Sequence, residues 1–263
     1  MSDGTVSYRR TDFYNDPDFN YAQFWVGRDY EHQAEVMALR QLLRGQRFAH
    51  AIDIGGGYGR LSVILGEYAD QVTLTDPSTQ QLDLSARIFP NMPHFDRVLT
   101  DATHLQFADH SVDLVALIRV LHHLPAPEPE FAELSRVLRP GGHAVVEVAN
   151  SVHAMRRISG LLAGHRGSKE PVDIRSDESR RRGTAPYFNH HPGTIARQLD
   201  AVGLRVCRVL SVSNLRHPAA KAVLPPRAML SIERLAQRPL GRLYFGPSVF
   251  FLLRKTVKAS SAR

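Results

Sequence analysis

AIDIGGGYGRL, residues 51–61, decides the fold of this chain, because it joins an apolar strand pattern directly to a glycine-rich turn. Glycines allow a tight backbone path from a strand end into a helix, and they leave no side chain between the backbone and a ligand. The spacing is D-x-G-x-G-x-G from Asp53 to Gly59, whereas dinucleotide folds use G-x-G-x-x-G, whose third glycine falls on Arg60. A frame that starts at Gly57 nearly fits that pattern. The loop alone indicates either a ligand site or a purely structural turn.

The residues around this loop alternate apolar runs with helical patterns. A helix is expected over YEHQAEVMALRQLLRG and another from Arg60 to about Tyr68, while the expected strands are AHAIDI, QVTLTD, RVLTD, VDLVALI and HAVVEVAN. Such alternation indicates βαβ units and a parallel sheet with helices on both faces. An irregular excursion over residues 151–186 interrupts the pattern, which a helix ending at Gly203, a strand and the closing run SVFFLLRKTV restore. Ligands bind such sheets at the carboxyl ends of the strands.

Length and composition indicate one main domain with a full core, since 43% of the 263 residues are apolar. No apolar run approaches the roughly 20 residues that cross a bilayer, and the N-terminus is too polar for a secretory signal. We therefore expect a soluble, cytoplasmic protein without stable membrane insertion. The single cysteine, Cys207, lies in the alternation LRVCRVL, which predicts a buried structural thiol and excludes an intramolecular disulfide.

The charge is distributed unevenly along the chain, whose net charge is +7. Residues 1–150 hold 12 Arg and 20 acidic residues, whereas residues 151–263 hold 21 basic and 6 acidic residues. A basic half can attract phosphates or anionic lipid, although a solvated basic face is the commoner explanation. Peripheral membrane contact through this half stays open.

Polar residues follow three further strands at the positions where a nucleotide-like ligand binds. Asp76 ends the second strand, 21 residues after Gly55, where a carboxylate can accept both hydroxyls of a ribose. Asp101 follows the third strand, with Ala102 beside it as an apolar neighbour for an adenine ring. The fourth strand leads into Arg119. Each aspartate could equally be a helix cap or turn former, but the four strand ends in this order favour a ligand site.

These motifs resemble the class I S-adenosylmethionine-dependent methyltransferases, in particular the small-molecule branch related to ubiquinone, sterol and polyketide methylases. The matching text is AIDIGGGYGRL, TLTDPS, LTDATHLQFADHSVDLV, IRVLHHLP and RVLRPGGHAVVEV, which covers roughly residues 48–150. The resemblance implies an α/β fold: a Rossmann-like, doubly wound, mostly parallel seven-stranded sheet with an antiparallel last strand, helices on both faces and helical lid elements. It also implies S-adenosyl-L-methionine as the cofactor.

The same resemblance implies which residues bind the cofactor. Gly55 and Gly57 would approach its methionine part, and Asp53 would orient the ammonium through the loop. Asp76 would bind the ribose and Asp101 would face the adenine amine. The cofactor-binding residues expected on this basis are Asp53, Gly55, Gly56, Gly57, Asp76, Pro77, Asp101, Ala102 and Arg119, the last of which stands where the family commonly has a small polar residue.

Two regions are expected, a lid of residues 1–45 with an aromatic arm and a helix, and a methyltransferase domain of residues 46–263. Insertions at about residues 151–192 and 215–245 would complete the lid over the acceptor. The side chains expected to contact the acceptor are Tyr21, Trp25, Tyr187 and Asn189, for which ring packing and a helix-entry loop are the alternative explanations.

Methyl transfer is an in-line displacement, so the protein must mainly hold the nucleophile within about 3 to 3.5 Å of the methyl carbon and exclude water. A hydroxyl acceptor would also use a general base. The candidate bases are His122, His190 and His191, whereas His123 is expected to be structural. No metal site is expected, because paired histidines without a carboxylate cluster lack the oxygen ligands of magnesium.

The sequence therefore predicts methyl transfer to O, N or C of a small-molecule acceptor: a specialised metabolite, a quinone-like compound or a lipid-linked compound. A nucleic-acid (RNA) methyltransferase that uses the basic half is the alternative. The chain lacks, however, the N/D-P-P-Y/F signature and the paired cysteines of such enzymes. A nicotinamide-dependent oxidoreductase would need the other glycine spacing and a Tyr-x-x-x-Lys motif, which is absent. The sequence predicts no oligomeric state.

Overall fold

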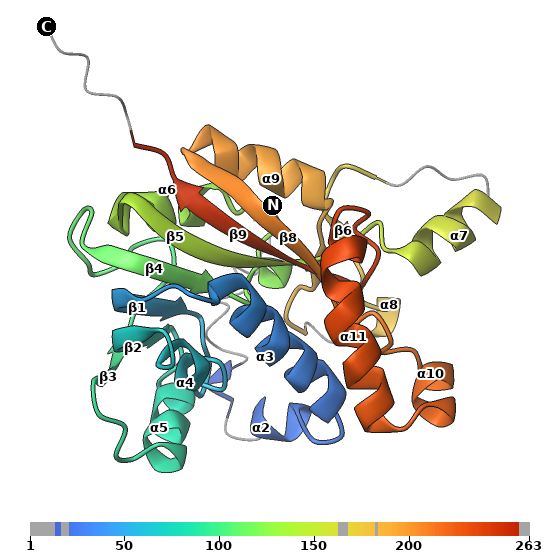
Figure 1. Ribbon diagram of the computed structural model, residues 1–263, viewed down its shortest axis with the longest axis horizontal. Coiled ribbons are helices and arrows are strands. Elements are labelled where there is room, and N and C mark those ends of the chain that lie inside the picture. The colour runs from blue at the N-terminus through green and yellow to red at the C-terminus, as the bar shows by residue number, and fades with distance from the viewer. Residues whose placement is uncertain (1–13, 17–20, 163–167, 182–183, 258–263) are drawn as a thin grey trace, which may run out of the picture.

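The structure, a computed structural model, describes residues 14–16, 21–162, 168–181 and 184–257, so much of the predicted aromatic arm lies outside the described residues. Its main sheet consists of β1 (Phe48–Ile54), β2 (Ala69–Asp76), β3 (Phe95–Leu99), β4 (Val112–Leu117), β5 (Leu138–Ala149), β8 (Leu204–Val212) and β9 (Ser248–Lys255). The strand order is β3-β2-β1-β4-β5-β9-β8, and only β9 runs antiparallel to its neighbours (Figure 1). This is the sheet predicted from the sequence.

The central strands are buried on both faces, which is why they are almost continuously apolar. All six residues of β4 are buried, and so are the last four of β1. The chain passes from β1 to β2 and β3 on one side and then returns to β4 and β5 on the other. The carboxyl ends of β1 and β4 therefore flank the point where the strand order reverses, which is where open α/β sheets bind ligands.

Helices cover both faces of the sheet (Figure 1). On one face, α3 (Asp29–Leu43) packs against the sheet beside α4 (Ser62–Leu65), and α11 (Pro226–Gly241) packs on α3 and β8. On the other face, α6 (Glu128–Val137) and α9 (Pro192–Ala201) contact each other over a second apolar core. The remaining elements are α2 (Tyr21–Phe24), α5 (Thr79–Ile88), η1 (Leu121–His123), α7 (Ala154–Leu162), β6 (Val172–Asp173), α8 (Asp177–Arg181), β7 (Phe188–Asn189) and α10 (Pro218–Val223).

Two details differ from the sequence predictions. The helix expected from Arg60 to about Tyr68 is reduced to the single turn of α4, whose last residue is followed by Gly66 as the C-cap. Cys207 is exposed rather than buried. It lies on the edge strand β8, where the pairing register with β9 shifts between Val206 and Arg208, and such a bulge breaks the alternation on which the prediction relied. None of the helices in the described ranges is long and apolar enough to cross a membrane.

Candidate functional site

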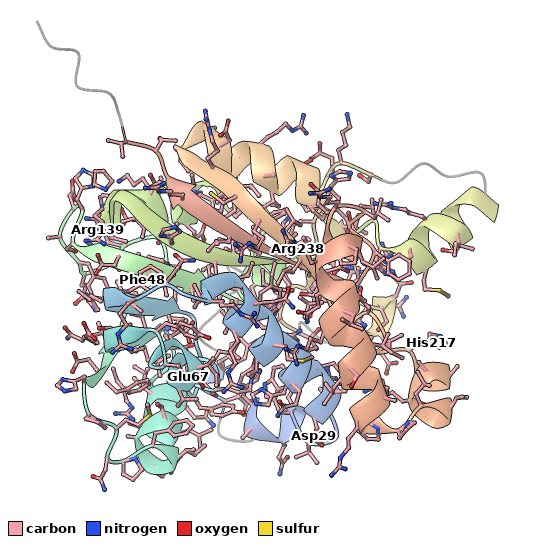
Figure 2. The ribbon with its side chains drawn as sticks, in the orientation of Figure 1. Asp29, Phe48, Glu67, Arg139, His217 and Arg238 are labelled. Carbon is pink, nitrogen blue, oxygen red and sulfur yellow. The ribbon has the colours of Figure 1, made fainter. Side chains whose placement is uncertain are left out.

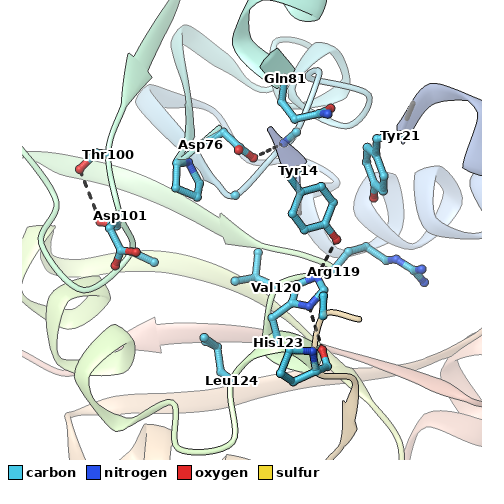
Figure 3. Close-up of a pocket in the computed structure, with 16 residues that line it drawn as sticks. Tyr14, Tyr21, Asp76, Gln81, Thr100, Asp101, Arg119, Val120, His123 and Leu124 are labelled. Atoms are coloured by element: carbon cyan, nitrogen blue, oxygen red, sulfur yellow. Dashed lines mark hydrogen bonds between the residues drawn. The ribbon is translucent and has the colours of Figure 1, made fainter. Parts of the chain in front are cut away.

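A cavity, called here the strand-end cavity, lies beside the carboxyl ends of β1 to β4, and it comprises about 850 Å³ of space when the solvent at its opening is included. Figure 3 shows its lining, which consists of Tyr14, Tyr21, Gly55, Gly57, Asp76, Pro77, Gln81, Thr100, Asp101, Ala102, Arg119, Val120, His123, Leu124, Ala185 and Pro186. The four predicted strand ends therefore meet at one site, where Tyr14, Tyr21, Ala185 and Pro186 join them from segments outside the sheet.

The glycine loop presents bare backbone to this cavity. Gly55 and Gly57 have φ angles of +63° and +61°, which L side chains rarely adopt. A Cβ atom on Gly55 would lie 2.6 Å from Cγ2 of Val120, and one on Gly57 would lie 3.2 Å from the Tyr21 ring. Any side chain at either position would therefore both strain the backbone and fill the space in front of the loop.

Asp53 and Gly56 lie behind the loop rather than in the cavity lining. The Asp53 side chain is 2% exposed and accepts a hydrogen bond of 2.6 Å from Ser62 Oγ, and burial raises its pKa to about 6. A Cβ atom on Gly56 would lie 2.6 Å from Asp53 Oδ2 and 2.5 Å from Leu74 Cδ1. Both residues can therefore act on a ligand only through the path of the loop.

Asp76 lies at the end of β2 and lines the cavity while its carboxylate is held by backbone donors. Its Oδ2 accepts a hydrogen bond from the Gly57 N–H and its Oδ1 accepts one from the Ser78 N–H, both at 2.9 Å. Burial raises the pKa of this carboxyl to about 6, although these two bonds act in the opposite direction. Each carboxylate oxygen has more than one acceptor position, so the group is fixed and can still bind ligand hydroxyls.

Gln81 is a lining residue that the sequence analysis missed. The pattern Ser78-x-x-Gln81 is that of a capping box, in which the glutamine would return to the Ser78 N–H. Asp76 already accepts the hydrogen bond from that N–H, and only the other half of the box forms, from the Gln81 N–H to Ser78 Oγ. The Gln81 side chain is 1% exposed, and neither Nε2 nor Oε1 has a hydrogen-bond partner among the described residues. A buried amide without a hydrogen-bond partner indicates that a polar ligand binds beside it.

Asp101 and Ala102 line the cavity after β3. The Asp101 Oδ1 atom accepts hydrogen bonds from the N–H of Thr103 at 2.8 Å and from its Oγ1 at 2.6 Å. Its Oδ2 atom accepts no hydrogen bond from the described residues. The turn therefore fixes the carboxylate and leaves one oxygen for a ligand donor such as an amine.

Arg119 follows β4 with a φ angle of +63°, and its N–H donates to Oε2 of Glu147 at 3.2 Å. Its side chain leads away from Asp101 toward Tyr21 (Figure 3). Burial lowers the pKa of the guanidinium, but the neighbouring Tyr187 and Glu35 reverse this effect, so the net shift is upward and the charge is kept. The Nε atom has no hydrogen-bond partner among the described residues.

None of the three predicted bases lines the strand-end cavity. His122 is 4% exposed with its ring stacked on Tyr187 at a centroid distance of 4.3 Å, and burial lowers its pKa well below the usual value. The Nε2 atom of His190 lies 3.0 Å from the Leu121 carbonyl. His191 is the N-cap of α9 and accepts a hydrogen bond from its first turn. Each of the three rings contacts a neighbouring part of the fold, and the role of a base stays a prediction for them.

His123, expected to be structural, is the histidine that lines the cavity. Consecutive residues of the short 3₁₀ turn η1 point about 120° apart, so only one of the pair can face the cavity. The His123 Nδ1 atom lies 3.2 Å from the Pro186 carbonyl, which can only accept, so we assign the ring proton to Nδ1. In that tautomer Nε2 accepts a hydrogen bond from the Tyr14 hydroxyl at 2.7 Å. The pair therefore joins the arm to the segment that follows α8.

The four residues expected to contact the acceptor have separate environments. Tyr21 lines the strand-end cavity. Trp25 is 8% exposed and packs under the Arg60 guanidinium, whose Cζ lies 3.5 Å from the ring centroid. Tyr187 stacks on His122, and Asn189 pairs with Val172 in the β6–β7 ribbon. In the part of the chain that the structure describes, no group of three His, Cys, Asp or Glu residues is placed to hold a metal ion.

Comparison with known proteins connects this geometry with a family. Residues 52–146, the segment from β1 into β5, match the family described as "Methyltransferase domain". The demethylmenaquinone methyltransferase of Chlamydia trachomatis serovar L2 is 34% identical over 96 residues, which are 36% of this chain and 42% of that protein. Residues 52–146 are therefore similar to a methyltransferase domain, and the sheet that contains them has the Rossmann-like fold of class I methyltransferases. The chain spans less than half the length of this curated relative.

Solved structures show that the fold of the methyltransferase domain extends beyond the matched segment. A Thermotoga maritima protein described as a SAM-dependent methyltransferase, possible histamine N-methyltransferase, aligns with a TM-score of 0.64 over 94% of this chain and 100% of that chain, at 15% identity. The N-methyltransferase NodS of Bradyrhizobium japonicum, solved with S-adenosyl-L-homocysteine, aligns with a TM-score of 0.54 over 86% of each chain, also at 15% identity. The methyltransferase fold therefore includes β8, β9 and the helices that pack on them.

Proposed function

We propose that the protein transfers the methyl group of S-adenosylmethionine to a small-molecule acceptor at an oxygen, nitrogen or carbon atom. The observation that carries this proposal is the strand-end cavity itself. It combines the backbone of Gly57, which carries no side chain, the fixed Asp76 carboxylate and the unpartnered Gln81 amide. These groups suit a ligand whose hydroxyl and amine groups donate hydrogen bonds, and S-adenosylmethionine carries such groups.

The lining residues fit the three parts of S-adenosylmethionine. Asp76 would accept hydrogen bonds from the ribose hydroxyls, because its oxygens are aimed at the cavity by backbone N–H groups. Asp101 would accept from the adenine amine, with Ala102 against the ring. The methionine part would lie against the backbone of Gly55 and Gly57, which line the cavity and carry no side chain of their own.

The residues of this chain would mainly position the reactants and exclude water. Bound S-adenosylmethionine supplies a methyl group on a positively charged sulfur. The thioether that remains after transfer is neutral, so its departure needs no acid. Tyr14 and Tyr21 from the arm, with Ala185 and Pro186 from the predicted insertion at about 151–192, line the cavity. We propose these two segments as the lid over the reacting groups. If the acceptor atom is a hydroxyl oxygen, the proposed proton acceptor is the Tyr14–His123 pair in place of His122: the Tyr14 hydroxyl would take the proton of the acceptor as it passes its own to Nε2 of His123.

The form of the cavity supports a small acceptor over a nucleic acid. Aromatic and aliphatic side chains from distant segments, among them Tyr14, Tyr21 and Pro186, close around it. Small-molecule sites are concave and largely apolar with a few placed polar groups. The curated relative named above acts on demethylmenaquinone, so a quinone-like acceptor is one class to test first.

Incubation of the purified protein with methyl-labelled S-adenosylmethionine and an extract of the source organism tests the proposal. After separation into organic-soluble compounds, nucleic acid and protein, the label is expected in a low-molecular-weight compound. Label found only in nucleic acid would contradict the small-molecule proposal and would favour the alternative function. The Asp76→Ala protein serves as the matched control, because its weaker binding of S-adenosylmethionine should lower the transfer of label to every fraction.

A further inference from the structure

A second cavity borders the strand-end cavity, and Arg119 lines both. The wall of this second cavity, called here the arginine cavity, comes from the turn between α2 and α3, the first turns of α3, the loop that follows β8, α10 and the start of β9. Its charged lining residues are Arg28, Glu31, Glu35, Arg119, Arg216 and Lys221. A molecule in this cavity would lie beside the Arg119 side chain, which also lines the proposed donor site.

The two carboxylates of the arginine cavity are already engaged by other cations. Glu31 Oε1 lies 2.7 Å from Nζ of Lys221. Glu35 Oε2 lies 2.5 Å from the guanidinium of Arg60, which stands outside the cavity lining, and its Oε1 lies 3.8 Å from Arg119. Two of the four lining cations, Arg28 and Arg216, make no ion pair with the described residues. The cavity therefore keeps an excess of positive charge.

The lining also contains hydrogen-bond donors that no acceptor satisfies. Arg216 is an exposed residue of this lining, and its guanidinium makes no ion pair or side-chain hydrogen bond with the described residues. The Nε atom of Arg119 is buried without a partner among the described residues. So is the Nε1 atom of Trp25, a residue that is 8% exposed. Buried hydrogen-bond donors normally have acceptors, so the two buried donors of Arg119 and Trp25 indicate that an acceptor is missing from this cavity.

One acceptor atom in this wall, Glu31 Oε2, is also buried and without a partner among the described residues. The charge of that carboxylate is nevertheless offset by Lys221. The cavity is therefore best matched by a group that brings acceptor oxygens and negative charge to Arg216 and Arg119. A planar guanidinium pairs well with the two oxygens of a carboxylate or phosphate.

We propose that the arginine cavity binds an oxyanion of the methyl acceptor, a carboxylate or a phosphate, through Arg216 and Arg119. This inference rests on the proposed function, because it places the acceptor beside the donor. The acceptor is then an anionic small molecule, and Arg216 determines the specificity for it. The methylated atom then lies on the Arg119 side of the strand-end cavity.

The test compares the wild type with Arg216→Gln and with Arg238→Gln, which removes the same charge from a separate groove lined by Arg44, Arg208 and Arg234. Figure 2 shows Arg238 near the end of α11, apart from Asp29 at the start of α3 and from His217 before α10. Each protein is incubated with methyl-labelled S-adenosylmethionine and a metabolite extract, and the small-molecule fraction is passed over an anion exchanger at pH 8. The wild-type product should be retained. Arg216→Gln should yield at least about tenfold less of it, and Arg238→Gln an amount within about twofold of wild type.

Two further measurements separate the acceptor site from the donor site. Calorimetry should give the same affinity for S-adenosyl-L-homocysteine in all three proteins. With S-adenosyl-L-homocysteine bound, inorganic phosphate should raise the melting temperature of the wild type and of Arg238→Gln but not that of Arg216→Gln. A ligand stabilises only the state that binds it. Phosphatase treatment of the labelled product should abolish its retention if the oxyanion is a phosphate ester, and should leave it unchanged if it is a carboxylate.

Each contrary outcome has a distinct meaning. Label in a neutral or cationic small molecule, or equal losses in Arg216→Gln and Arg238→Gln, would overturn this inference and leave the proposed function intact. Label confined to nucleic acid or protein would overturn the proposed function and this inference with it.

Discussion

The strand-end cavity and the arginine cavity share the Arg119 side chain but are assembled in different ways. Most of the strand-end cavity comes from loops that directly follow β1, β2, β3 and β4, so short motifs specify it. The arginine cavity brings together residues that are far apart in the sequence, such as Arg28 and Arg216. Local sequence therefore encodes the proposed donor site, whereas the proposed acceptor site depends on how α3, α10 and the end of β8 pack.

The two cavities also differ in charge, and the difference follows the charge asymmetry of the chain. The acidic first half supplies Asp76 and Asp101 to the strand-end cavity, which suits a donor rich in hydroxyl and amine groups. The basic second half supplies Arg216 and Lys221 to the arginine cavity. The basic residues behind the net charge of +7 are therefore not only on a solvated face, because Arg216 and Lys221 lie beside the proposed reaction centre.

A pair of glycine variants gives the largest expected contrast between the cavities. Gly55→Ala should lower the free energy of unfolding by roughly 2 to 5 kcal/mol, because it adds a steric conflict with Val120 to the cost of a left-handed alanine. Gly27→Ala at the arginine cavity, with a φ angle of +74° and no atom within 4 Å of the added Cβ, should cost only about 1 to 2 kcal/mol. Urea unfolding measures both, and equal costs would contradict the tight path assigned to the glycine loop.

Removal of the ribose ligand should weaken only the donor site. Asp76→Ala is expected to reduce the affinity for S-adenosyl-L-homocysteine by about 1 to 3 kcal/mol, since the carboxylate would no longer accept the ribose hydroxyls. Asp83→Ala, an exposed position on α5, is the matched control and should leave the affinity unchanged. Calorimetry tests the pair. An Asp76→Ala protein that binds as tightly as the wild type would remove Asp76 from the donor site.

The pH dependence of donor binding should identify the same carboxylate. Burial raises the pKa of Asp76 to about 6, so this group is protonated below that pH in the free protein. If the ribose binds the ionised carboxylate, the affinity for S-adenosyl-L-homocysteine should be constant above pH 7 and fall by up to about tenfold per unit below pH 6. Asp53 has a similarly raised pKa, so Asp76→Asn is needed to assign the effect. A wild-type profile that this variant reproduces would exclude Asp76 as its origin.

The smallest expected effect concerns the contact between the arm and η1. Tyr14→Phe removes the hydroxyl that donates to His123, which should weaken donor binding by about 0.5 to 1.5 kcal/mol. The stabilisation by inorganic phosphate should not change, because Tyr14 does not line the arginine cavity. Tyr68→Phe, at a tyrosine whose hydroxyl has no partner among the described residues, is the control. Loss of phosphate stabilisation in Tyr14→Phe would show that the cavities do not act separately.

The sheet and the proposed donor residues were predictable because their signals are local. Asp76 and Asp101 each follow an apolar strand directly, and parallel strands place their carboxyl ends at one edge. The glycine spacing likewise predicted the tight turn in which Gly55 and Gly57 adopt positive φ angles and line the cavity. In each case, a short segment of sequence determines both the conformation and the position in the sheet.

The remaining residues were missed because competing local patterns or distant contacts decide them. Gln81 has the spacing of a capping box, and only the competition of Asp76 for the Ser78 N–H frees its side chain. His122 and His123 are equivalent in sequence, and the 3₁₀ geometry of η1 selects between them. Arg216 carries no sequence signal at all, because its role depends on the packing of its loop against α3 and Arg119.

A crystal structure of the protein with S-adenosyl-L-homocysteine tests the central claim most directly. The ribose should lie within hydrogen-bond distance of Asp76, the adenine beside Asp101 and Ala102, and the amino-acid part against Gly55 and Gly57. The sulfur should then face the side of the cavity that Arg119 shares with the arginine cavity. A bound molecule outside the strand-end cavity, or one whose ribose does not contact Asp76, would contradict this account.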